Sequence, residues 1–150
     1  MKKIEDNTIE QLMERPYWIV DVLPKQVPPG SRGQYFTVEK YLLDRQRRAA
    51  LGEKQADILI KLNCYEDLDV STDCEHWQHN PAPEELSLLV HDCITGNQPL
   101  YILMAEGETL LTLSGDVTYM TLYNPSADVL DVVSALASAQ GLFVWPIITD

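Results

Sequence analysis

The hydrophobic and polar positions of this chain follow a strand, turn, strand, helix, strand pattern over residues 108–145. Residues 110–113 and 117–123 are rich in β-branched, aromatic and aliphatic side chains, and a Ser-Gly-Asp turn at residues 114–116 separates them. Helical spacing follows, in Val129, Leu130, Val133, Leu136 and Ala137, before a last apolar run at residues 142–145. The pattern predicts a β-β-α-β unit whose helix packs one apolar stripe on the sheet formed by its flanking strands.

The expected ends of that helix carry their own signals. Asn124 is a residue type that caps helices, and Pro125 suits the first helical position because its missing N–H has no partner there. Gly141 provides the left-handed residue at which many helices end. We therefore expect the helix to begin directly after Asn124 and to end before Gly141.

Similar patterns place elements along the rest of the chain. Residues 5–14 and 84–93 have amphipathic helical spacing, and residues 17–23 and 100–104 are apolar runs of strand length. Residues 24–33 form a loop rich in Pro and Gly, at whose end Ser31 and Gln34 have the spacing of a capping box that opens a helix. The helical pattern continues past Gly52 to about residue 65, with a strand as the alternative for residues 58–62.

Together these elements predict one α+β domain that spans residues 1–150. We expect a mainly antiparallel sheet of about five or six strands, with residues 17–23 and 100–123 at its centre and three or four helices largely on one face. A chain of 150 residues, 45% of them hydrophobic, is long enough for one substantial core and short for two. One domain is therefore the expected organisation.

The distribution of charge is the most unusual feature of the sequence. All eleven Lys and Arg lie within residues 1–61, which also carry nine acidic residues and so have a formal charge of +2. Residues 62–150 carry fourteen acidic residues and no Lys or Arg, a formal charge of −14, which brings the whole chain to −12. Soluble surfaces ordinarily mix both signs, so the acidic half indicates either a device for solubility or a surface that captures something positive.

Charge and hydropathy argue against several classes of protein. Nucleic-acid binding requires cationic side chains that displace counterions from phosphates, and the acidic half has none. No apolar run approaches the roughly 20 residues of a membrane-spanning helix, and the first seven residues, MKKIEDN, do not resemble a signal peptide. Three cysteines without repeated spacing suit a reducing compartment. We expect a cytoplasmic protein without a nucleic-acid or membrane partner.

Residues 66–75 are the most acidic stretch of the chain. Five of these ten residues are acidic, namely Glu66, Asp67, Asp69, Asp73 and Glu75. Oxygen-bearing side chains alternate with less polar ones, which predicts a half-buried strand with an acidic outer face. A calcium-binding loop has similar spacing, but Thr72 replaces its glycine and Gln78 stands where its bidentate glutamate belongs. The five acids, with Trp77 as an anchor, are the expected contact surface for a basic partner.

A cluster of histidines and cysteines overlaps the acidic stretch. Its members are Cys74, His76, His79, His91 and Cys93. A turn at residues 80–83 could bring four nitrogen and sulfur ligands around zinc. The spacing matches no established zinc pattern, and on a helix Cys93 is instead a small buried residue and His91 a surface residue. The same side chains include the histidine bases that a cysteine nucleophile needs, so the cluster is also the candidate site of a hydrolase.

Two charged positions stand out in the first half of the chain. Asp21 lies within the apolar run 17–23, where it is either a catalytic carboxylate with a raised pKa or a side chain that faces solvent or bonds a neighbouring backbone group. Residues 45–48, Arg-Gln-Arg-Arg, form the one dense basic patch. We interpret this patch as a solvated helix face, partly paired with Asp44.

The acidic half favours one class of function over the others. We expect a protein–protein interaction or inhibitory module, comparable in charge and size to immunity-type inhibitors, that presents an acidic face to a basic protein partner. One alternative is a zinc protein or hydrolase built on the histidine and cysteine cluster. The second is a homo-oligomeric structural protein, in which the basic half of one copy contacts the acidic half of another.

Overall fold

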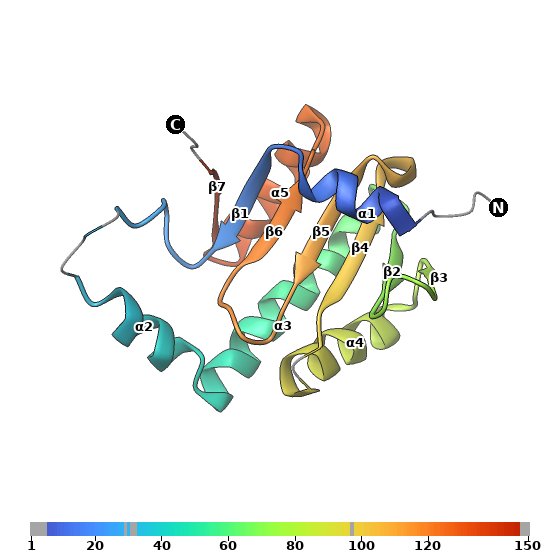
Figure 1. Cartoon of the computed structure of the whole chain (residues 1–150). Helices are drawn as coiled ribbons and strands as arrows, with labels where there is room; N and C mark the ends of the chain where they lie inside the picture. Colours follow the sequence, from blue (N-terminus) through green and yellow to red (C-terminus); the bar gives the residue numbers. More distant parts are fainter. Residues whose placement is uncertain (1–5, 29, 31–32, 97, 148–150) are drawn as a thin grey trace.

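A seven-stranded antiparallel sheet organises the chain (Figure 1). The computed structural model describes residues 6–28, 30, 33–96 and 98–147. The strand order is β3-β2-β4-β5-β6-β1-β7. The strands are β1 (Tyr17–Asp21), β2 (Asp69–Ser71), β3 (Gln78–His79), β4 (Leu100–Met104), β5 (Thr109–Leu113), β6 (Met120–Tyr123) and β7 (Phe143–Pro146). The α+β prediction is confirmed, and the strand that it lacked is the two-residue edge strand β3.

Five α-helices and one short 3₁₀ helix accompany the sheet in the described part of the chain. They are α1 (Asp6–Met13), α2 (Tyr35–Leu42), α3 (Arg45–Leu62), α4 (Pro83–Gly96), the 3₁₀ helix η1 (Ala105–Gly107) and α5 (Ala127–Ala139). Figure 1 shows α3, α4 and α5 behind the sheet, α1 in front of it, and α2 projecting from the lower edge. The expected long helix divides at Asp44 into α2 and α3, and residues 58–62 are helical.

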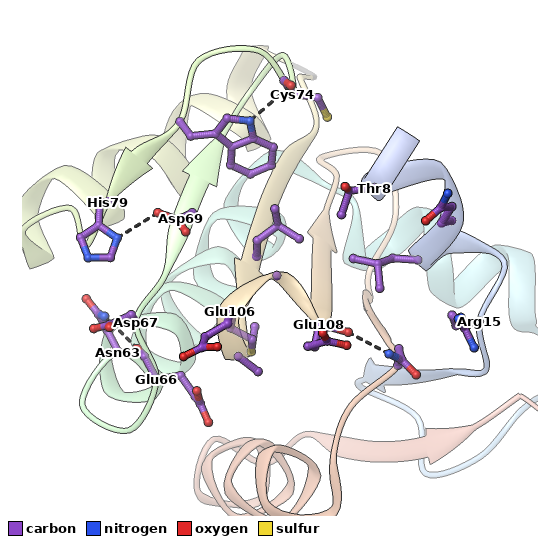
Figure 2. Close-up of a pocket in the computed structure, with 18 of the residues that line it drawn as sticks. Thr8, Arg15, Asn63, Glu66, Asp67, Asp69, Cys74, His79, Glu106 and Glu108 are labelled. Carbon is purple, nitrogen blue, oxygen red and sulfur yellow. Dashed lines mark hydrogen bonds and ion pairs between the residues drawn. The ribbon is translucent and has the colours of Figure 1, made fainter. Parts of the chain in front are cut away.

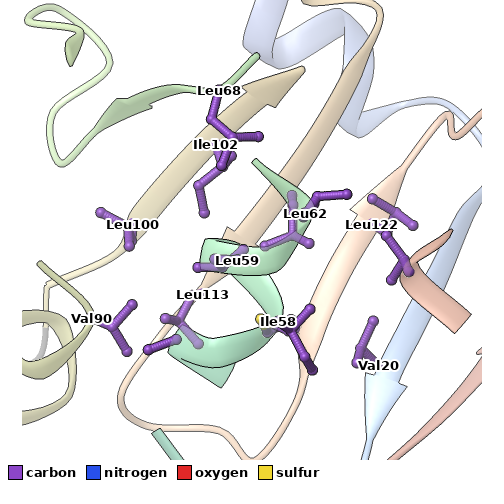
Figure 3. Close-up of a cluster of buried hydrophobic side chains, with 14 of the residues drawn as sticks. Val20, Ile58, Leu59, Leu62, Leu68, Val90, Leu100, Ile102, Leu113 and Leu122 are labelled. Carbon is purple, nitrogen blue, oxygen red and sulfur yellow. The ribbon is translucent and has the colours of Figure 1, made fainter. Parts of the chain in front are cut away.

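The main core lies between the sheet and the three helices behind it. Alternate residues of the central strands, including Ile102, Leu111 and Leu122, face these helices. Helix α3 contributes Ile58, Leu59 and Leu62, each 0% exposed. Figure 3 shows these side chains within the cluster. Burying one such side chain stabilises a fold by roughly 1.5–3 kcal/mol, so this single helix carries much of the core.

A smaller core lies on the opposite face of the sheet. Ile9 and Leu12 of α1 pack on Leu103 of β4 and Leu110 of β5, which point away from α3 because side chains alternate along a strand. Helix α1 covers only this part of the front face (Figure 1).

The C-terminal β-β-α-β unit is confirmed, with two corrections. Helix α5 is capped by Ser126, whose Oγ accepts the N–H of Val129 at 3.2 Å. The prediction that Asn124 caps this helix is wrong, since Asn124 has a left-handed backbone (φ 56°) that ends β6. Gly141 (φ 75°) ends the helix as expected. Strand β7 then pairs with β1 instead of a strand of its own unit.

The acidic stretch 66–75 does not form one continuous strand. Strand β2 ends at Ser71, whose Oγ accepts the backbone N–H of Cys74 at 2.8 Å. Asp73 Oδ1 then accepts the N–H groups of Glu75 and His76 at 2.8 and 2.9 Å. These local bonds favour a turn over an extended chain, so the predicted alternation to residue 75 is wrong.

The basic patch at residues 45–48 is only partly a solvated surface. Arg47 pairs with Asp44 at 3.3 Å, as expected. Arg48 is only 2% exposed, and it donates to Gln55 Oε1 at 3.0 Å and to the carbonyl oxygen of Ser114 at 3.1 Å. The arginine therefore ties α3 to the turn between β5 and β6 from inside the fold.

Candidate functional site: an acidic groove

A large groove lies at the end of the sheet where α3 ends. Its volume is about 1240 Å³. It is lined by six carboxylates, namely Glu66, Asp67, Asp69, Glu75, Glu106 and Glu108. Arg15 is the one Lys or Arg among its described lining residues, and His79 and Trp77 also line it. Figure 2 labels most of these side chains, among them Glu66, Asp69 and Glu106, and we call this site the acidic groove.

One wall of the acidic groove is held by a network around Asn80. Its Oδ1 accepts both the N–H of Leu68 and the side-chain amide of Asn63 at 2.8 Å. Its own amide donates to Asp67 Oδ1 at 3.0 Å, and His79 pairs with Asp69 at 2.9 Å. These bonds fix the segment after α3 against β2 and β3, so the acidic side chains of this wall have defined positions.

The facing wall is an unusual turn between β4 and β5. Ala105, Glu106 and Gly107 all have positive φ values, of 53°, 57° and 85°. A run of left-handed residues is unfavourable for side chains with a Cβ, and such strain persists where the surrounding structure holds it. Asn124 helps to hold it, because its amide donates to the carbonyl oxygen of Glu108 at 2.8 Å. The turn directs two glutamates toward the acidic groove (Figure 2).

Trp77 connects the groove to the smaller core. Its indole N–H donates to the carbonyl oxygen of Cys74 at 3.3 Å, and its ring packs on the cluster that contains Ile9 and Leu12. The side chain is half-buried. Trp77 therefore offers a fixed aromatic surface at the groove and is not a freely exposed anchor.

Most of the acids expected from the sequence line the acidic groove. Glu66, Asp67, Asp69 and Glu75 do so, and Asp73 does not. Hydrogen bonds from the backbone N–H and the ring of His76, followed by the N–H of Glu75, hold the pKa of Asp73 well below its usual range. The hydrogen bond to Asp73 raises the pKa of His76, and the one to Asp69 raises that of His79.

Sequence reasoning missed the contribution of the β4–β5 turn. Glu106 and Glu108 flank Gly107 directly after a predicted strand, and this acid-glycine-acid turn was the available signal. The position of α1, with Arg15 at the groove, had no such signal. The β4–β5 turn meets the acidic stretch because β2 pairs with β4, and α1 reaches the groove because it packs on Leu103 and Leu110.

The five predicted zinc ligands occupy separate places. His76 and His79 are engaged by Asp73 and Asp69, His91 is exposed on α4, and Cys93 is buried behind the sheet. Cys74 is half-buried at the groove. Within residues 6–28, 30, 33–96 and 98–147, the one trio whose ligand atoms lie within 4.8 Å of one another is Asp73, Glu75 and His76. Only one of the five predicted ligands, His76, belongs to it.

The cysteines do not show an activated nucleophile. Burial raises the pKa of the Cys93 thiol to about 11, and its Sγ lies 3.5 Å from the carbonyl oxygen of Leu113. A thiol in this environment is not a thiolate near neutral pH. Cys64 is exposed and lines the acidic groove.

No described helix has the length and apolar composition needed to cross a bilayer. Comparison of the chain with models of protein families, with curated proteins and with solved structures gave no match.

Proposed function

We propose that the protein is an interaction or inhibitory module that captures a basic segment of a protein partner in the acidic groove. The observation that carries this proposal is the convergence of six carboxylates from separate segments on one cavity whose described lining contains a single arginine. Like charges repel, so gathering them without matching cations reduces stability. A bound basic segment would offset that repulsion.

The orientation of α3 strengthens the negative potential of the groove. The C-terminus of a helix carries a partial negative charge, and α3 ends beside the acidic groove at Leu62. Its first turn contains Arg45, Arg47 and Arg48 and no acidic residue, which is the unfavourable arrangement for a helix dipole. With 18 residues at about 1.5 Å each, the helix separates its arginine-rich first turn from the acidic groove by roughly 27 Å.

The aromatic residues suit a cationic ligand. Tyr65, 67% exposed, and Trp77 both line the groove among the carboxylates. Arginine and lysine side chains bind aromatic faces as well as carboxylates, and arginine forms two parallel bonds with a carboxylate. The expected partner segment is therefore rich in arginine or lysine.

The other functional classes receive less support. A zinc protein or hydrolase would need the histidines and cysteines to converge, and in the described chain they do not. A homo-oligomer through opposite charges remains the alternative to a foreign partner, because the basic start of α3 and the acidic groove lie at opposite ends of one helix. Analytical ultracentrifugation at low salt would distinguish the two hypotheses. A monomer would contradict the homo-oligomer and favour a foreign partner.

The direct test uses a labelled peptide of nine arginines and fluorescence anisotropy at 50 and 200 mM salt. The groove variant Glu106→Gln/Glu108→Gln removes two charges from the β4–β5 turn. Each exposed charge pair contributes roughly 0.2–1 kcal/mol, so the variant should lose about 1 kcal/mol of peptide-binding free energy. Its Kd should therefore be roughly fivefold weaker. Affinity should also fall as salt rises, because exposed charges are screened.

A matched variant controls for net charge. Glu53→Gln/Asp92→Asn removes the same number of carboxylates from exposed positions outside the groove lining, on α3 and α4. It should weaken peptide binding less than twofold. Equal losses in the two variants would show that the charge acts diffusely, as a device for solubility, and would contradict a groove that binds a partner.

A further inference from the structure

A second pocket, whose lining shares no residue with the acidic groove, lies on the front of the sheet over β1, β6 and β7. Its volume is about 660 Å³, within the range of roughly 300–1,000 Å³ typical of small-molecule sites. We define it by the six lining residues Tyr17, Asp21, Tyr35, Tyr119, Tyr123 and Trp145 and call it the tyrosine pocket. Five of the six are aromatic.

Strand register places these side chains on one face. Tyr17 lies opposite Tyr123, and Ile19 lies opposite both Thr121 and Trp145. Residues paired across antiparallel strands point to the same side, so these rows form one surface that faces away from the main core. The rings of Tyr17 and Tyr123 are 5.4 Å apart, tilted by 43°. This surface is the floor of the tyrosine pocket.

Hydrogen bonds hold two aromatic walls of the tyrosine pocket at the end where β1 finishes. The indole N–H of Trp145 donates to the carbonyl oxygen of Leu23 at 2.9 Å, which holds the ring beside the end of β1. The hydroxyl of Tyr35, on α2, donates to Glu39 at 3.2 Å. Burial, followed by Glu39, raises the pKa of Tyr35 to about 12, so the phenol is neutral at physiological pH. The two hydrogen bonds hold the Trp145 and Tyr35 rings in place in the lining of the pocket.

A carboxylate lies at this end of the pocket. Asp21 is only 5% exposed, and its Oδ1 accepts the N–H of Val22 at 2.7 Å and the hydroxyl of Thr118 at 3.4 Å. It is opposite Phe143 in the sheet. The sequence allowed three roles for this aspartate, and the bond to a neighbouring backbone group is confirmed. The solvent-facing alternative is wrong.

The negative charge of Asp21 lacks a cation in the described chain. The ion pairs formed there join Arg47 to Asp44, His76 to Asp73, and His79 to Asp69, and none involves Asp21. Glu39 adds further negative potential, and Lys25 is the one Lys or Arg among the described lining residues, without ion-pair contact to the aspartate. A buried charge without a partner costs free energy, which a bound cation would recover.

We propose that the tyrosine pocket binds a quaternary ammonium group. Aromatic faces attract cations through their quadrupoles, and aromatic cages are a common means of recognising quaternary ammonium ligands. Such a cation has no N–H to donate and is weakly hydrated, so it gains from several rings and one carboxylate without needing a set of oxygen ligands. A metal ion would need more oxygen donors than this pocket offers. The group could belong to a free molecule such as choline or to a trimethylated lysine side chain.

The test is calorimetric titration of the whole protein with choline, with a short peptide that contains trimethyllysine, and with 3,3-dimethylbutan-1-ol. The alcohol has the shape of choline without its charge. The cation should bind at least tenfold more tightly than the neutral isostere, and the tighter of the two cationic probes identifies the source. In NMR spectra the indole signal of Trp145 should shift on binding, whereas that of Trp77, in the acidic groove, should not.

Variants decide whether the pocket itself is responsible. Asp21→Asn should weaken choline or trimethyllysine binding at least fivefold, and Asp92→Asn, an exposed aspartate on α4, should leave it unchanged. Tyr119→Leu should also weaken binding, and it serves if Asp21→Asn does not fold. Absence of binding by both cationic probes would overturn the proposal. Equal affinity for the isostere, or full affinity in both pocket variants, would do the same.

Discussion

The substitution Asp21→Asn should make the protein more stable at neutral pH. Burial raises the pKa of Asp21, and this effect outweighs the opposing hydrogen bonds from Val22, Thr118 and Leu23. Because its folded-state pKa lies above the ordinary value of 3.8, the folded protein binds more protons than the unfolded chain between those two values. Stability therefore falls as pH rises through this window and stays lower above it.

The magnitude follows from what asparagine keeps and what it removes. Its carbonyl oxygen can still accept from Val22, 2.7 Å away, and from Thr118, so these two donors keep their partner. The buried negative charge is gone. Removing an unfavourable functional group of this kind typically stabilises a protein by about 0.5–2 kcal/mol. At about 1 kcal/mol, Tm rises by roughly 2–4 °C, and the urea midpoint by roughly 0.5 M for an m-value near 2 kcal/mol/M.

The assay is urea unfolding followed by circular dichroism at pH 7.5 and at pH 4. The gain in stability from Asp21→Asn should be present at pH 7.5 and smaller at pH 4, where more of the folded wild-type protein carries a protonated Asp21. Asp92→Asn, an exposed substitution, should stay within about 0.5 kcal/mol of wild type at both pH values. A variant less stable than wild type at pH 7.5 would refute the reasoning, since the hydrogen bonds of the carboxylate would then outweigh its burial.

Two further predictions concern the turns of the fold. NMR titration should give His76 a pKa above 6.5, and Asp73→Asn should return that pKa toward 6.5, while His79, paired with Asp69, keeps its raised pKa. The stability contributed by His76 is present below pH 6.5 and is lost as pH rises through the folded-state pKa of His76. The stability contributed by Asp73 is present above pH 3.8 and is lost as pH falls through the folded-state pKa of Asp73. Unchanged titration of His76 in Asp73→Asn would contradict the pairing. Gly115→Ala should destabilise the protein by about 1–3 kcal/mol in chemical unfolding, because the new Cβ would lie 2.8 Å from the backbone carbonyl oxygens of Cys93 and Ile94, and wild-type stability would show that this contact is absent.

Both proposed sites combine segments that are distant in the sequence. The acidic groove joins the end of α3, β2 and the β4–β5 turn, and the tyrosine pocket joins β1, β6, β7 and α2. Each places negative charge beside aromatic rings at a cost in stability. Sites that violate the ordinary rules of folding are where function is expected, because the rest of the fold must compensate for them.

Local patterns were enough to predict most elements and their class. The hairpin, the helix that ends at Gly141 and the helical identity of α4 follow from periodicity and turn chemistry, which act over a few residues. The errors also have local causes. The side chains of Ser71 and Asp73 accept hydrogen bonds from the backbone and end β2. Ser126, and not Asn124, caps α5. Periodicity does not report such side-chain bonds.

By itself, the sequence determined that the protein is an α+β domain and that residues 62–150 carry no Lys or Arg. Only the tertiary structure decided which charges meet. Pairing of β2 with β4 brings Asp69 and Glu106 to one groove, and the arrangement of α3 behind the sheet buries Arg48 while Arg47 stays exposed. These outcomes depend on contacts between residues that are far apart in the chain. Hydrophobic periodicity shows only which side of its own element a residue occupies, and not what that side faces.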